Sequence, residues 1–159
     1  MCYDFVMPRN AVDYDADFVA WSEEQARLLR AREFNALDIK NIAEEIESLG
    51  RSDKRAIVNR LVVLITHLLK WQYQAKSRSK GWLGSIDEQR RRIEMLVEES
   101  PSLQPMLPAL VAKAYPAARR KAARDMTVEI AALPAECPYA FDAVLRDEFY
   151  PGDNGTAAR

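Results

Sequence analysis

The chain has little glycine, cysteine and histidine, and no long apolar run. Only five glycines are present, which leaves few turn-forming residues for an all-β fold. No apolar stretch approaches the roughly 18 to 20 residues of a transmembrane helix, and the N-terminus lacks the basic start and apolar centre of a signal peptide. Cys2 and Cys137 are too far apart for a metal motif, so free thiols are expected. We therefore predict a cytoplasmic protein that does not enter the membrane.

The composition is that of an ordinary globular protein. With 159 residues, of which 48% are hydrophobic and 30% charged, the chain is long enough to bury a core within one domain. The net charge of −1 is unevenly spread, because residues 1–50 carry −6, residues 51–92 carry +8 and residues 93–159 carry −3. Such segments can neutralise each other or leave a basic face for phosphate groups.

Apolar residues recur every three or four positions, which predicts helices over most of the chain. The fold class expected is all-α, a single-domain helical bundle of about five main helices plus a short C-terminal helix. We expect an extended arm at 1–14, a helical domain at 15–151 and a disordered tail at 152–159. Within the domain, the expected helices cover about 15–32, 38–49, 52–74, 82–99 and 101 onward, with a short helix at 141–145.

Two residues are expected to interrupt the helical pattern. Gly50 follows the apolar positions Ile39, Ile42, Ile46 and Leu49, where a glycine in the left-handed conformation would end a helix. The next helix has an apolar face about half its circumference wide, so it is expected to be central to the bundle. Pro116 falls inside a later helical pattern and predicts a kink or break there.

Six short blocks resemble the bacterial family known as "domain of unknown function 29". Together they extend over nearly the whole chain, from about residue 14 to 151. They are YDADFVAW at 14–21, NIAEEIESLGR at 41–51, HLLKWQY at 67–73, QRRRI at 89–93, SPSL at 100–103 and ECPY at 136–139. The resemblance implies a small, all-helical cytosolic protein from a bacterium, and it implies no activity. Pro116 departs from the family pattern, in which this helix would run through.

Three polar residues are candidate metal ligands. Glutamate and histidine side chains from facing helices form metal centres in helical bundles, and Glu45, Glu47 and His67 lie on or beside the apolar faces of two expected helices. The more common alternative is that the glutamates form ion pairs and that His67 is a hydrogen-bonded residue at the edge of the core. No serine or cysteine nucleophile lies at a recognisable spacing from His67.

Arginine and lysine residues lead to two further hypotheses. Arg90 lies on the inner face of its expected helix, so we predict a structural ion pair with Glu45. The other hypothesis concerns phosphate contacts by a basic cluster that has aromatic residues nearby. Its members are Lys76, Arg78, Lys80, Arg91 and Arg92.

The function that the sequence favours is a non-enzymatic protein-interaction module. No catalytic or cofactor motif is found, so we expect no cofactor. The expected partner is a protein or a second copy of the chain, in a homodimer formed through aromatic and apolar residues near the two ends. Those residues are Tyr3, Phe5, Val6, Phe149 and Tyr150. The alternative is nucleic-acid binding by the segment 76–92, and the third hypothesis is a metal-dependent enzyme at Glu45, Glu47 and His67.

Overall fold

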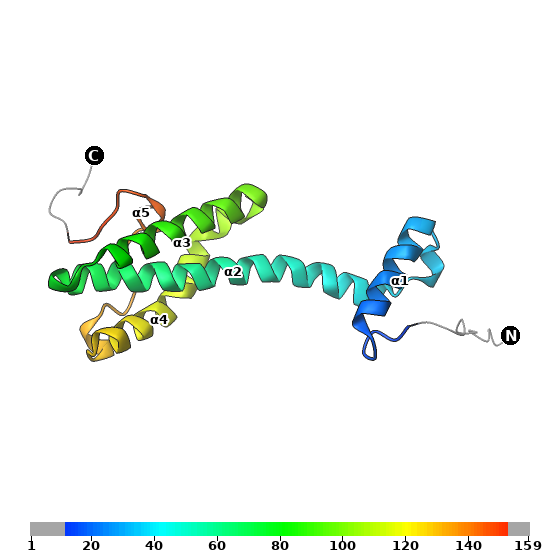
Figure 1. Cartoon of the computed structure of the whole chain (residues 1–159), viewed down its shortest axis with the longest axis horizontal. Helices are drawn as coiled ribbons and strands as arrows, with labels where there is room; N and C mark the ends of the chain where they lie inside the picture. Colours follow the sequence, from blue (N-terminus) through cyan, green and yellow to red (C-terminus); the bar gives the residue numbers. More distant parts are fainter. Residues whose placement is uncertain (1–11, 153–159) are drawn as a thin grey trace. The chain divides into compact units, whose positions relative to one another are not determined.

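The computed structural model describes residues 12–152, which confirm the all-α class. Their α-helices are α1 (Phe18–Ala31), α2 (Ile39–Tyr73), α3 (Lys80–Glu99), α4 (Leu107–Met126) and α5 (Phe141–Leu145), shown in Figure 1. Short 3-10 helices follow α1, α2, α3 and α4. Most of the predicted arm and tail lies outside the described residues. None of the helices in 12–152 combines the length and the apolar composition that a membrane crossing needs.

The chain divides into two compact units, residues 1–50 and 51–159, and α2 contributes to both. In the first unit, α1 packs on the start of α2. Asp17 caps α1 by accepting a hydrogen bond from the backbone N–H of Ala20. Two residues of α1 then bind Asp38. Trp21 Nε1 donates to Asp38 Oδ2 at 3.3 Å, and Gln25 Oε1 accepts from the backbone N–H of Asp38 at 2.9 Å.

The second unit contains the hydrophobic core. It is built around α2, against which α3 and α4 lie (Figure 1). The wide apolar face predicted for this part of α2 is buried in that core, so its central role is confirmed. Side chains of α2 that are completely buried there are Ile57, Leu61, Leu64, Ile65, Leu68 and Leu69. This unit also contains the helix predicted at 82–99, which begins slightly earlier at Lys80, and the short helix at 141–145.

The two predicted interruptions did not end a helix. Gly50 lies inside a continuous α2, so the expected second and third helices are one, and α4 runs through Pro116. A helical glycine costs only about 1 kcal/mol relative to alanine, which the hydrogen bonds of the turns on both sides offset. The left-handed residues that do follow helices are Arg32 (φ 59°) and Thr127 (φ 56°), two non-glycine residues that the sequence pattern did not single out.

Candidate functional site

Arg90 binds backbone carbonyls instead of a carboxylate. Its side chain is buried, with the residue 3% exposed, and its Nε and Nη1 lie 3.0 Å from the carbonyl oxygens of Val144 and Asp147. Its Nη2 lies 2.8 Å from the carbonyl oxygen of Phe149. Burial lowers the pKa of Arg90, although nearby acidic groups oppose that shift. One guanidinium therefore holds the C-terminal segment onto α3.

The predicted pair between Glu45 and Arg90 is therefore wrong. The structure gives Glu45 a different partner, because the Tyr14 hydroxyl donates a hydrogen bond to Glu45 Oε1 in the first unit. This hydrogen bond is the main cause that raises the pKa of Tyr14 to about 12. A single sequence shows that a buried arginine needs acceptors, but it does not distinguish carboxylates from the carbonyls of a non-helical segment.

The predicted phosphate-contacting residues do not form one free cationic surface. Arg78 donates from Nε to the Trp71 carbonyl at 3.0 Å and stacks its guanidinium over the Trp71 ring at 4.6 Å. Arg91 and Arg92 both form ion pairs with Glu88, one turn away on α3. Lys76 and Lys80 are exposed, and Lys80, at the start of α3, lies roughly 16 Å along the helix from Arg91 and Arg92.

His67 is a hydrogen-bonded residue at the core edge. Its Nδ1 lies 2.8 Å from the carbonyl oxygen of Val63, so this nitrogen carries the proton and donates. The Ser85 hydroxyl, which the sequence spacing did not reveal, lies 3.5 Å from the same nitrogen. A protonated Nδ1 cannot accept the serine proton, so this pair is not an activated nucleophile. Partial burial lowers the pKa of His67.

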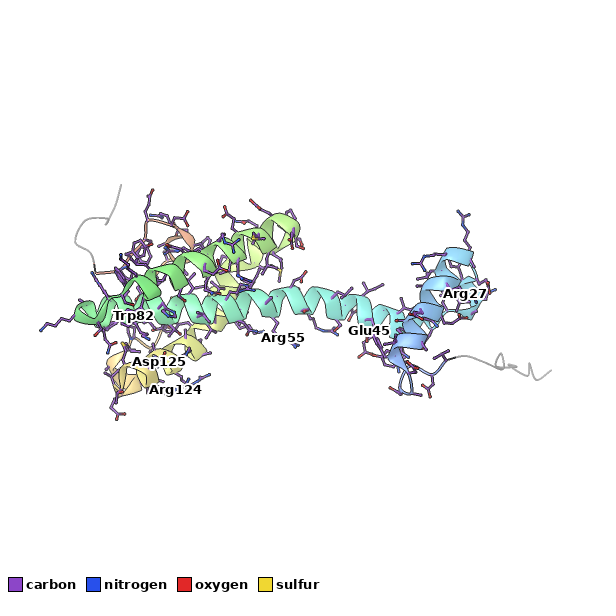
Figure 2. The ribbon with its side chains drawn as sticks, in the orientation of Figure 1. Arg27, Glu45, Arg55, Trp82, Arg124 and Asp125 are labelled. Atoms are coloured by element: carbon purple, nitrogen blue, oxygen red, sulfur yellow. The ribbon has the colours of Figure 1, made fainter. Side chains whose placement is uncertain are left out.

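A cluster of charges lies beside His67, where α2, α3 and α4 meet. Asp125 accepts ion pairs from Lys70 at 3.7 Å and Lys121 at 3.4 Å. The ammonium of Lys70 also lies 4.7 Å from the centre of the Trp82 ring. Figure 2 labels Trp82 and Asp125, which come from α3 and α4. These contacts pair both lysines with groups of the chain, so the cluster links the three helices.

The metal hypothesis does not fit the fold. It placed Glu45 and Glu47 on a helix facing that of His67, but all three residues belong to the one continuous helix α2. Among the residues that the structure describes, no group of three or more His, Cys, Asp and Glu side chains is arranged to hold a metal ion.

The C-terminal aromatics expected to be exposed are packed on the core. Phe149 makes an edge contact with Tyr139 at 5.6 Å between ring centres, and the Tyr150 ring lies 5.4 Å from that of Trp71. The Tyr150 hydroxyl donates to Asp87 Oδ1 at 2.9 Å. Phe149 and Tyr150 are therefore half-buried and keep only part of their surface for a partner, and Tyr3, Phe5 and Val6 lie outside the described residues.

An apolar stripe on the first part of α2 is exposed. We define it as Ile39, Ile42, Ile46 and Leu49, whose spacing of three, four and three residues places them along one helix face. Ile39 is 62%, Ile46 64% and Leu49 70% exposed, while Ile42 is half-buried. The sequence predicted this stripe as a core face, and the structure leaves most of it uncovered.

A cationic groove lies in the second unit, where α2 meets the start of α4. It encloses about 360 Å³. Its lining residues are Arg51, Lys54, Arg55, Val58, Met106, Leu110 and Lys113. Val58, Met106 and Leu110 are apolar, and the other four are cations. Arg55 projects from α2 in Figure 2. The groove therefore offers both apolar and electrostatic contacts, a combination that the sequence pattern did not reveal.

The fold and these surfaces define an all-helical protein without an evident catalytic centre in its described part. The chain belongs to the family described as "Domain of unknown function DUF29", whose model matches residues 14–150. The resemblance found in the sequence is thereby confirmed. No curated protein and no solved structure matches the chain.

Proposed function

We propose that this protein is a non-enzymatic protein-interaction module that docks partners on the apolar stripe of α2. The observation that carries the proposal is the exposure of Ile39, Ile46 and Leu49, each more than three-fifths accessible. A helix normally buries such a stripe against another element, and contiguous exposed apolar surface marks a docking site. The spacing suits a partner helix that inserts between these side chains.

The first unit supports this proposal because its described residues leave further apolar surface exposed. Further large apolar residues are exposed there on α1 and in the turn that follows it. They are Phe18, Val19, Leu29 and Phe34. Two short packed helices bury too little surface to be stable alone, so contact with a partner would stabilise the unit.

The two other hypotheses have less support. Nucleic-acid binding by the segment 76–92 needs several free cations on that surface, whereas Arg78, Arg91 and Arg92 already contact groups of this chain. A metal-dependent enzyme needs ligands that converge, and Glu45, Glu47 and His67 share one helix. The bacterial origin and the cytoplasmic location stay predictions, which are compatible with an interaction module.

The proposal is tested by comparing proteins that co-purify with the tagged full-length chain and its variants. Ile46→Glu places a charge in the middle of the stripe and should remove the specific partners. Ile130→Glu is the matched control, because Ile130 is also exposed but lies in the second unit. Partners retained equally by the wild type and both variants would contradict the proposal.

A further inference from the structure

The cationic groove has the features of a receptor for an acidic amphipathic helix. Val58, Met106 and Leu110 give it an apolar floor, which a phosphate group alone would leave uncovered. A cationic rim surrounds this floor, so an uncharged apolar ligand would leave the rim without a partner. A ligand that satisfies both parts presents apolar side chains and carboxylates together.

Three of the four rim cations lack an acidic partner in the described part of the chain. Within the described part of the chain, Lys54, Arg55 and Lys113 make no ion pair or side-chain hydrogen bond. By contrast, Lys70 and Lys121 in the same unit share Asp125. Several like charges around one groove repel each other, and an acidic ligand would relieve that repulsion.

The first unit has the complementary surface. Glu45 and Glu47 lie on opposite margins of the apolar stripe, and residues 1–50 carry a net charge of −6, whereas residues 51–92 carry +8. Two stripes would bring like charges together, whereas a stripe and a groove bring opposite charges together. Resting on the proposed function, we propose that the cationic groove of one copy binds the apolar stripe of a second copy.

Stripe and groove are different surfaces that follow one another along α2. Two copies can exchange them in a closed dimer, in which each stripe fills the other copy's groove, or each copy can leave one stripe and one groove open to further copies. The wild type should therefore form dimers or larger species as its concentration rises. High salt should weaken the association, because part of the attraction is electrostatic and solvent-exposed.

The experiment uses two full-length variants, each lacking one half of the contact. The stripe variant combines Ile46→Glu with Leu49→Glu, and the groove variant combines Lys54→Glu with Lys113→Glu. All four side chains are exposed, so circular dichroism should show both variants folded. Lys76→Glu with Lys80→Glu is the matched control for the groove variant, since it reverses two exposed cations elsewhere in the second unit.

Sedimentation velocity should show each variant as a monomer by itself. An equimolar mixture should form a one-to-one complex that grows no further, because it contains one intact stripe and one intact groove. The control variant should associate as the wild type does, and the affinity lost in either variant should be at least about tenfold.

The outcomes separate this inference from the proposed function. A groove variant that associates like the wild type, or a mixture that stays monomeric, overturns the inference. A monomeric wild type at several hundred micromolar also overturns it. In each case the proposed function stands if Ile46→Glu still removes co-purifying partners, and it falls only if that variant retains them.

Discussion

The two units use their apolar residues in opposite ways. In the first, the buried side chains of α1 are Trp21, Gln25 and Leu28, and most of the α2 stripe is exposed. In the second, α2, α3 and α4 share a continuous core that also includes Leu133, Tyr139 and Val144 from the part of the chain after α4. The same long helix, α2, is therefore buried by its own chain in the second unit and largely exposed in the first.

This difference indicates where the stability of the protein originates. In the second unit, burial of apolar surface already stabilises the folded chain, because its apolar faces contact each other. In the first unit, the exposed apolar surface contributes such stabilisation only when a binding partner covers it. An exposed stripe that recurs with helical spacing is thus better explained by binding than by folding.

The sharpest test of the contrast compares one leucine from each unit. Leu68→Ala should lower the free energy of unfolding by about 2 to 5 kcal/mol, because Leu68 is completely buried. Leu49→Ala should change it by less than about 0.5 kcal/mol at low protein concentration, because Leu49 is exposed and both residues favour helices. Chemical denaturation measures both values. Equal losses would show that the stripe is part of a core in the free protein.

A second test removes the arginine that holds the C-terminal segment. Arg90→Met should cost about 3 kcal/mol, because three carbonyl groups lose their donor. Arg90→Lys should recover little of the stability that Arg90→Met loses, since one ammonium group cannot reproduce the fork geometry of the guanidinium. Arg91→Met is the control, and its loss should be below about 1 kcal/mol, because Arg91 is exposed. The same denaturation experiment applies, and a similar loss in Arg90→Met and Arg91→Met would contradict this role.

The smallest expected effect concerns His67 and pH. Partial burial lowers its pKa below the ordinary value of 6.5, so folding favours the neutral ring. Its contribution to stability is present above pH 6.5 and is lost as the pH falls through the folded-state pKa. Between about pH 7 and pH 5, the wild type should therefore lose more stability than His67→Gln. Thermal unfolding at several pH values measures the difference, and parallel curves would show that His67 does not contribute.

Prediction from sequence was most accurate where the pattern is local. Phe141–Leu145 was predicted with its observed bounds, and α1 and α3 were predicted to within a few residues. Gly50 and Pro116 misled the prediction because each lowers the helix propensity at one position, whereas the surrounding turns determine the outcome. The site hypotheses failed at Arg90 for another reason, since its acceptors come from a distant non-helical segment.

By itself, the sequence determined the all-helical class, the amphipathic faces and the separation of acidic and basic segments. These are properties of periodicity and composition, which one chain displays without any knowledge of its contacts. Only the tertiary structure decided which faces are covered, because burial depends on what packs opposite each helix. It covered the face of α2 that contains Leu61 and Leu68, left most of the stripe exposed, and brought Lys54 and Lys113 to one groove from two helices.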